Sequence, residues 1–178
     1  GHNEPIVFEG FGDKFKEGNN KLDLALKSPS ALPYTVTVDY RTNDPQNSAE
    51  VPLKLATTIA KDQVKMGETV RVTATLESTS DDGLPMTLIR IGVPGGLAYQ
   101  TWQLKELVDK KEIAFYETRA REVIVYFRAL QPKAKKVINI DLTANVPGRY
   151  TAPASRAYLY YTAEHKTWAT PLKVQISR

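Results

Sequence analysis

Residues 81–96 read DDGLPMTLIRIGVPGG and residues 101–111 read TWQLKELVDKK, and together they decide the fold class. The first segment combines a strand pattern with a glycine-rich turn, and the second has the apolar spacing of one short helix. Strand patterns return at EVIVYFRAL, residues 122–130, and at VPGRYTAPASRAYLYYT, residues 146–162. A single helix among strands therefore predicts an all-β fold with one helical crossover.

Alternation of apolar and polar side chains predicts the other strands. Apolar residues recur at every second position in residues 34–40, 70–76 and 138–144, as half-buried strands require. Residues 123–127 are apolar on both faces, which is typical of a central strand covered on both sides. Polar turns separate these runs, so we predict an all-β, antiparallel β-sandwich with one short inserted α-helix.

The helix is expected over residues 102–110. Leu104, Leu107 and Val108 fall at i, i+3 and i+4 and form one apolar stripe. Thr101 stands where an N-cap hydroxyl is needed. The stripe predicts that this side of the helix packs on the sandwich.

Trp102 lies on the other side of the same helical wheel, beside Lys105 and Glu106. Two placements are open for its indole ring. The ring folds back under the turn at residues 95–96, or it lies on the surface. We favour the first placement because tryptophan is usually largely buried.

A domain boundary is expected near residue 50. Residues 41–50 are polar, contain a proline and show no periodicity, which indicates a linker or a long loop. The segment before them has too little apolar material for a core of its own. We therefore divide the chain into residues 1–50 and residues 51–178, with the β-sandwich in the second part.

Composition excludes several classes of protein. The chain has 178 residues, is 42% hydrophobic and 25% charged, and carries a net charge of +4, as ordinary folded domains do. Its basic residues are scattered and are not interleaved with stacking aromatics, so we expect no nucleic-acid partner. No apolar run approaches the ~20 residues of a membrane-spanning segment. The absence of cysteine excludes disulfides, thiolate metal sites and cysteine nucleophiles.

The sequence also argues against an enzyme. The two histidines, His2 and His165, stand in polar segments, and His165 is expected to be a solvated loop side chain. Asp81 and Asp82 are too few for a calcium site and fit a turn. Pro94 begins a turn that lacks the lysine of a phosphate loop. We therefore expect no catalytic residue, no cofactor and no metal ligand.

Aromatic residues gather near the C-terminus, and they support an alternative function. Tyr158, Tyr160 and Tyr161, together with Trp168, have the chemistry of a sugar-binding face. The alternative is therefore a carbohydrate-binding or adhesin-type β-sandwich. Packing within and between the sheets explains the same residues and is favoured, because aromatic side chains fit pleated surfaces.

Four short motifs carry a family resemblance: GLPM at 83–86, PGGL at 94–97, TWQLKEL at 101–107 and PASRAYLYY at 153–161. They resemble the C-terminal receptor-binding domain of the α2-macroglobulin family, and their wording is most similar to bacterial-type members. Residues 51–178 resemble this sandwich over its whole length. Residues 4–40 resemble the second half of the family's CUB-like β domain, and with the linker they make up residues 1–50.

The resemblance implies a function without chemistry in this chain. It implies a C-terminal fragment of an α2-macroglobulin-type, broad-spectrum endopeptidase inhibitor, acting as a non-catalytic interaction and packing module. The family's thioester requires a Cys-Gly-Glu-Gln motif, and this chain has no cysteine. The implied partners are the rest of the parent protein, with its thioester and macroglobulin domains, and target proteases through the parent. The implied location is extracellular or periplasmic.

The resemblance also points to two candidate protein-binding residues, Lys105 and Trp102. In animal members, two lysines four positions apart on the helix dock into a receptor related to the LDL receptor. Lys105 matches the second lysine, and Thr101 stands in place of the first. We do not expect tight receptor docking, because recognition at two points loses most of its strength when one point is removed.

Overall fold

The computed structural model describes residues 6–16, 18–27, 31–39, 42 and 45–178. The chain forms two compact units, Gly1–Arg41 and Thr42–Arg178. His2 and Tyr40 lie outside the described residues. The assignment of the first 50 residues to a CUB-like segment stays a prediction.

The first unit contains little regular structure in its described part. A short 3-10 helix, η1, spans Gly12–Lys14, and no strand is assigned there. The strand expected at 34–40 is therefore wrong for residues 34–39. Alternation describes the two faces of a strand, but a strand also needs a neighbour for its hydrogen bonds. No such neighbour is present among the described residues, and Tyr34 remains 77% exposed.

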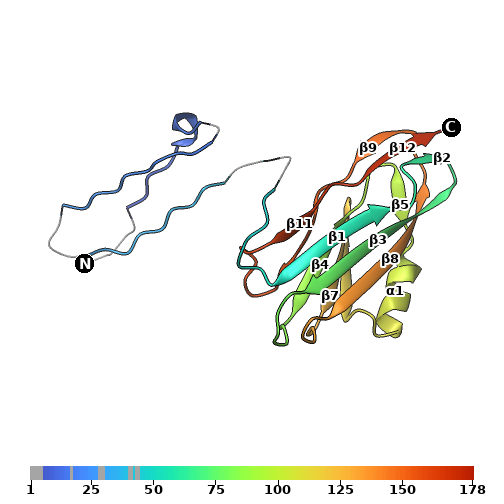
Figure 1. Ribbon diagram of the computed structural model, residues 1–178. Helices are drawn as coiled ribbons and strands as arrows, with labels where there is room; N and C mark the ends of the chain where they lie inside the picture. Colours follow the sequence, from blue (N-terminus) through green and yellow to red (C-terminus); the bar gives the residue numbers. More distant parts are fainter. Residues whose placement is uncertain (1–5, 17, 28–30, 40–41, 43–44) are drawn as a thin grey trace. The chain divides into compact units, whose positions relative to one another are not determined.

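The second unit is a β-sandwich with a small third sheet (Figure 1). One sheet has four antiparallel strands in the order β1 (Leu53–Ile59), β3 (Thr69–Ser78), β8 (Lys135–Ala144) and β5 (Leu97–Tyr99). The other has five, in the order β11 (Thr167–Ala169), β10 (Ser155–Leu159), β4 (Thr87–Gly92), β7 (Glu122–Phe127) and β6 (Phe115–Arg119). In the third sheet, β12 (Lys173–Ser177) pairs parallel with β2 (Gln63–Lys65) and antiparallel with β9 (Gly148–Thr151).

The core lies between the two large sheets and is built from the apolar residues that alternate with polar ones along the strands. Val72 of β3 is in register with Ile140 of β8, and both are buried in the core cluster. The expected central strand is β7, which lies between β4 and β6. Val123 and Val125 of β7 are fully buried in the same cluster. The predicted fold class, an all-β sandwich with one short helix, is confirmed.

Helix α1 (Thr101–Asp109) links the edge strand of one sheet, β5, to the edge strand of the other, β6 (Figure 1). It contacts β6 and β8, so it covers the side of the sandwich between them. The predicted stripe is confirmed, because Leu104 is fully buried while Leu107 and Val108 are partly buried against the core.

The helix begins one residue earlier than expected, at the residue that was predicted to cap it. The N-cap is Gln100, whose side chain makes no capping hydrogen bond, and Thr101 is the first helical residue. The chain stays extended only as far as Gln100, so the proposed capping role of Thr101 is wrong.

Tyr150 occupies the place that was expected for Trp102. Gly96 has a φ of +83°, and a Cβ built on it would lie 2.4 Å from the Tyr150 ring. The Tyr150 hydroxyl donates to the carbonyl of Pro147 at 3.1 Å, which holds the ring over the turn. Trp102 is therefore 63% exposed, and the prediction that it folds back is wrong.

The end of the predicted linker is bound to the sandwich. The Trp168 N–H donates to the side-chain oxygen of Asn47 at 2.7 Å. His165 Nδ1 lies 2.9 Å from the carboxylate of Glu50 and 3.2 Å from the hydroxyl of Ser48. The His165 side chain is only 34% exposed, so the expectation of a solvated loop histidine is wrong. Its neighbours come from a distant part of the chain.

Candidate functional site

The two predicted binding residues lie on the outer side of α1. Trp102 is 63% exposed, and Lys105 is also exposed. Lys105 forms no ion pair with the part of the chain that the structure describes. Thr101, the position of the missing lysine, is exposed beside them. The helix therefore offers one indole ring and one unpaired cation to solvent.

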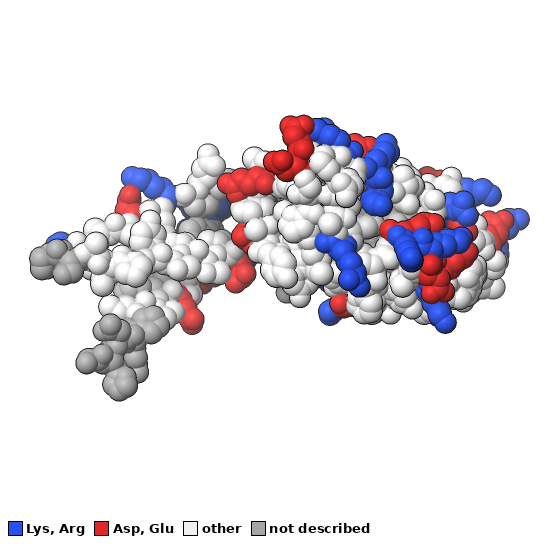
Figure 2. Space-filling model, turned by 90° about the horizontal axis from the view of Figure 1, so that it is seen from below, with Lys and Arg blue, Asp and Glu red and all other residues white. Residues whose placement is uncertain are grey.

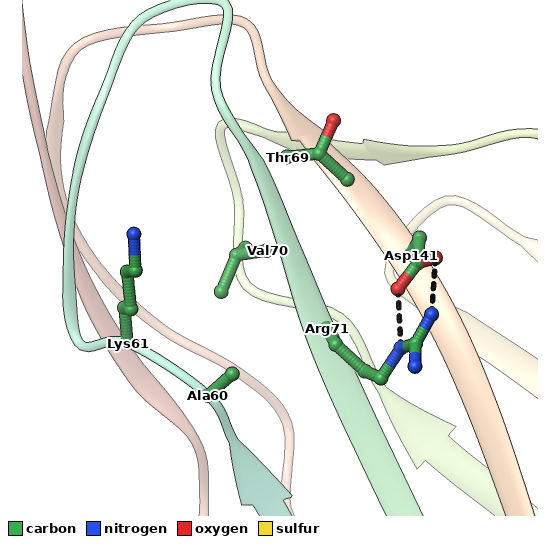
Figure 3. A pocket seen from close by; sticks show the side chains of 6 residues that line it. All are labelled: Ala60, Lys61, Thr69, Val70, Arg71 and Asp141. Atoms are coloured by element: carbon green, nitrogen blue, oxygen red, sulfur yellow. Dashed lines mark hydrogen bonds and ion pairs between the residues drawn. The ribbon is translucent and has the colours of Figure 1, made fainter.

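A shallow cleft of about 320 Å³ opens on the four-stranded sheet (Figure 3). It is lined by Ala60, Lys61, Thr69, Val70, Arg71 and Asp141. Arg71 of β3 donates to Asp141 of β8 through Nε at 2.7 Å and Nη2 at 2.8 Å. This hydrogen bond and the guanidinium charge lower the pKa of the Asp141 carboxyl, against the effect of burial. The two charges satisfy each other, so Lys61 is the lining charge left without an ion partner among the described residues.

A more developed surface covers the outer side of the five-stranded sheet, and we call it the aromatic face. Its rings belong to Phe115, Tyr126, Tyr158, Tyr160 and Trp168. The strand register aligns three of them, because Tyr158 pairs with Leu88, Leu88 with Tyr126 and Tyr126 with Phe115. The row therefore crosses β10, β4, β7 and β6 on one side of the sheet.

Two aliphatic side chains lie beneath the aromatic face. Leu88 and Ile124 are each 3% exposed, yet neither belongs to the core cluster between the sheets. Successive residues of a strand point to opposite faces. Their neighbours Ile89 and Val125 belong to the core cluster, so Leu88 and Ile124 are buried on the outer side. The sheet thus carries a second, small apolar cluster on the side away from the sandwich core.

An ion network occupies the same face. Glu122 of β7 accepts hydrogen bonds from Arg90 of β4, through Nε at 3.1 Å and also through Nη2. It accepts a third from Arg156 of β10 at 2.8 Å. The three side chains are 12–24% exposed. The Arg156 guanidinium also lies 5.5 Å from the Trp168 ring centre, in the range of a cation–π contact.

Tyr126 connects the aromatic row to a carboxylate. Its hydroxyl donates to Glu117 of β6 at 2.7 Å. Burial, together with this hydrogen bond and the negative charge of Glu117, raises the pKa of Tyr126 to about 12. The hydrogen bond from this hydroxyl to Glu117 fixes the ring in the row.

The arrangement of the rings bears on the sugar-binding alternative. The Trp168 ring is covered by Arg156, and Lys166 Nζ lies 5.4 Å from the Tyr158 ring centre. Tyr160 and Tyr161 are exposed but meet edge to face, with an interplanar angle of 80°. They do not form one flat platform. Most of these rings already have partners within the protein, which favours packing over sugar binding.

Sequence reasoning missed the ion network of Arg90, Glu122 and Arg156. A partial signal was available, because Arg90 is a lone charge in the apolar run TLIRIG, residues 87–92. A charge at such a position needs a partner. The partner could not be identified, since register brings β4, β7 and β10 together only in the folded sheet.

On the face shown in Figure 2, basic and acidic side chains of the sandwich are interspersed rather than separated by sign. Among the described residues, no helix is long and apolar enough to cross a membrane. The same residues contain no group of three or more histidine, aspartate or glutamate side chains suited to a metal ion.

Comparisons with known proteins agree with this architecture. The solved structures that resemble the chain include trypsin-activated alpha-2-macroglobulin from Escherichia coli, with a TM-score of 0.61 at 14% identity, covering 76% of this chain and 11% of that one. Salmonella alpha-2-macroglobulin reacted with methylamine gives a TM-score of 0.61 at 16% identity, with 76% and 10% covered. A native E. coli fragment from domain MG7 to the C-terminus gives 0.57 at 14% identity, with 75% and 25% covered.

These identities show a shared fold, and this chain spans a quarter or less of the length of each structure. No curated protein matches the chain significantly. The model of the bacterial alpha-2-macroglobulin MG10 domain matches residues 34–164, which is most of the chain. This match shows that the chain, an all-β sandwich with one crossover helix, belongs to the bacterial alpha-2-macroglobulin family.

Proposed function

We propose that this chain is the C-terminal, non-catalytic interaction module of an alpha-2-macroglobulin-type, broad-spectrum endopeptidase inhibitor. Membership of the family and the small share of the solved structures that it spans support this role. Its partners would be the thioester and macroglobulin domains of the parent, and target proteases would be reached through that parent. The parent would act outside the cell or in the periplasm.

The aromatic face is the observation that carries the proposal. Phe115 and Tyr160 are 57% and 49% exposed at its margin, while Leu88 and Ile124 lie buried at its centre. Interfaces between proteins are enriched in aromatic residues and arginine around an apolar centre. The ion network holds the arginines of this face in place before any partner arrives. Such a prearranged surface suits packing against another domain of the parent.

The chain would contribute binding rather than trapping. Without a cysteine it has no thioester of its own, and the family resemblance places the bait region in another part of the parent. In the parent, the module would pack against its neighbours before cleavage and would be displaced or exposed afterwards. Trp102 and Lys105 on α1 remain our second proposed contact surface, smaller than the aromatic face.

The first experiment measures inhibition by the isolated chain. The 178-residue protein is incubated with trypsin and a protein substrate, over ratios up to a molar excess of the chain. We expect no protection of the substrate at any ratio. Protection that rises with dose and saturates near one chain per protease would refute the proposal.

The second experiment tests the aromatic face within the intact parent. Phe115→Ser combined with Tyr160→Ser removes two exposed rings, and Met66→Ser, at a position that is 54% exposed, is the matched control. We expect the double variant to accelerate limited proteolysis between the module and its neighbours, with no change in the stability of the isolated chain. Equal proteolysis in the double variant and the control would contradict this assignment of the interface.

A further inference from the structure

A pocket of about 550 Å³ lies where α1 ends, outside the surfaces described above. The end of α1, the loop that follows it, the end of β7 and the start of β8 form its walls. It is lined by Val108, Lys111, Glu112, Ile113, Ala114, Phe127, Arg128, Ala129 and Lys136, and we call it the helix-end pocket. It is open to solvent rather than enclosed, so a chain segment can reach it without any rearrangement.

The helix-end pocket carries an excess of positive charge. Lys111, Arg128 and Lys136 stand against one acid, Glu112, which gives three positive charges and one negative. None of the three cations forms an ion pair within the described residues. Glu112 acts on another side chain, because its charge raises the pKa of Lys110, after the larger effects of Glu106.

The contrast with neighbouring lysines shows that the charge excess is local. Lys110, next to Lys111, pairs with Glu106 at 2.6 Å. Lys135, next to Lys136, pairs with Glu77 at 2.7 Å. The acids of this region thus neutralise lysines outside the pocket. The lysines that line the pocket keep their charge available to a ligand.

The floor of the pocket is apolar and fixed. Ile113 and Phe127 are each 3% exposed, and Val108 packs partly buried against the core. Lys136 lies opposite Leu76 in the strand register, so it stands on the core-facing side of β8 at the open end of the sandwich. Its aliphatic stem can cover apolar surface while the ammonium group stays in water. A ligand here meets apolar atoms and unpaired cations together.

Lys111 has a left-handed backbone conformation, which is unfavourable for a residue with a side chain. Its N–H donates to the carbonyl of Val108 at 2.9 Å, and the Glu112 N–H donates to that of Leu107 at 3.0 Å. This is the Schellman ending of a helix, in which the left-handed position is usually glycine. Lys111 occupies it with a φ of 59°. The positively charged Lys111 side chain is therefore present at a position where the backbone conformation favours glycine.

We propose that the helix-end pocket binds an acidic polypeptide segment that also carries large apolar side chains. The unpaired cations come from three separate elements around an open rim, which matches carboxylates spaced along a peptide. The apolar floor matches side chains that point between them. This partner chemistry is independent of the proposed function, and the pocket is distinct from the helix surface that presents Trp102 and Lys105.

The experiment measures binding of short fluorescent peptides to the full chain by fluorescence polarisation, at low and at physiological salt. One peptide alternates glutamate with leucine, a second alternates glutamate with serine, and a third alternates glutamine with leucine. Binding is repeated with Arg128→Gln, Lys136→Gln and Lys111→Gly. Lys173→Gln is the matched control, because it removes an exposed lysine of β12 that forms no ion pair among the described residues and does not line the pocket.

We expect the glutamate–leucine peptide to bind best and to weaken with salt. Each pocket variant should reduce its affinity by about two- to fivefold, as for single exposed charge pairs, and the Arg128→Gln/Lys136→Gln double variant by at least about fourfold. Lys173→Gln should leave it unchanged. Absence of binding to the native chain, equal losses in all variants including Lys173→Gln, or equal binding of the glutamate–serine peptide would each overturn the proposal. Thermal unfolding of each variant confirms that it is folded.

Discussion

The side chain of Gln103 pairs with both main-chain groups of Asp141. Its Nε2 donates to the Asp141 carbonyl at 2.8 Å, and its Oε1 accepts from the Asp141 N–H at 2.9 Å. Strand β5 ends its pairing with β8 at Tyr99 opposite Leu142, the residue that directly follows Asp141 in β8. The helical Gln103 therefore continues the hydrogen-bonding ladder where the strand has ended. This contact explains how α1 is fixed against β8.

Replacing Gln103 by alanine should destabilise the fold. The substitution leaves the partly buried N–H and carbonyl of Asp141 without their partners, and we expect a loss of about 1–3 kcal/mol in the free energy of unfolding. Urea denaturation measures it. Gln100→Ala is the control, since Gln100 is exposed and makes no capping hydrogen bond, and it should change stability by less than about 0.5 kcal/mol. Equal losses in the two variants would show that the ladder contact contributes nothing.

Replacing Lys111 by glycine should stabilise the protein. Lys111 has a φ of 59°, a conformation that glycine adopts without the cost of a Cβ, so we expect a gain of up to about 1 kcal/mol. Lys110→Gly provides the opposite control, because Lys110 has a right-handed conformation with a φ of −76°. Glycine there should destabilise by about 0.5–1 kcal/mol. Thermal unfolding of the pair tests the prediction, which fails if both changes have the same sign.

Replacing Glu122 by glutamine should cost more than the loss of a surface charge. The change keeps the shape of the side chain but leaves Arg90 and Arg156 without their shared anion, at 12–24% side-chain exposure. We expect a loss of about 1–3 kcal/mol, less than for a fully buried pair because water reaches these groups. Glu77→Gln, which breaks an exposed pair with Lys135, should lose clearly less stability than Glu122→Gln. A Glu122→Gln variant as stable as Glu77→Gln would count against a structural role for the network.

Tyr126 should ionise late in an alkaline titration followed by ultraviolet absorbance. Its pKa is raised from 10.0 to about 12 by burial and by Glu117, so the folded state resists ionisation. The associated stability is therefore present below pH 10 and is lost as the pH rises towards 12. Tyr126→Phe should remove the late phase, and Glu117→Gln should move it to lower pH. A native titration complete near the ordinary tyrosine pKa would contradict the described environment.

The apolar stripe of α1 should contribute unequally to stability. Leu104 is fully buried, so Leu104→Ala should cost about 2–5 kcal/mol. Leu107 is only partly buried and should cost less when replaced by alanine. Lys105→Ala, at an exposed position, should stay within about 0.5 kcal/mol. Denaturant unfolding of the three variants gives the order directly, and a larger loss for Leu107→Ala than for Leu104→Ala would reverse it.

Short-range patterns were enough for much of the sandwich. The alternation at 70–76 and 138–144, the doubly apolar run at 123–127 and the stripe on α1 all predicted the elements that form. Burial on one face or on both leaves a repeat of two in a strand and of three to four in a helix. The family resemblance, carried by short motifs in the same region, is confirmed by the match over residues 34–164.

The same kind of pattern failed at residues 34–39, where alternation is present but no strand forms. A sequence repeat records which side chains could share a face, but it does not supply the neighbouring strand that completes the hydrogen bonds. The indole of Trp102 was misplaced for a related reason, because Tyr150 arrives from a distant strand to cover Gly96.

By itself, then, the sequence determined the all-β class, the single crossover helix and the absence of cysteine chemistry. Only the tertiary structure decided which distant groups meet: Gln103 with Asp141, Glu122 with two arginines, and the cations of the helix-end pocket with one another. Local periodicity depends on residues a few positions apart. These contacts depend on strand register and on the packing of α1 across the open side of the sandwich, which join residues that the sequence separates.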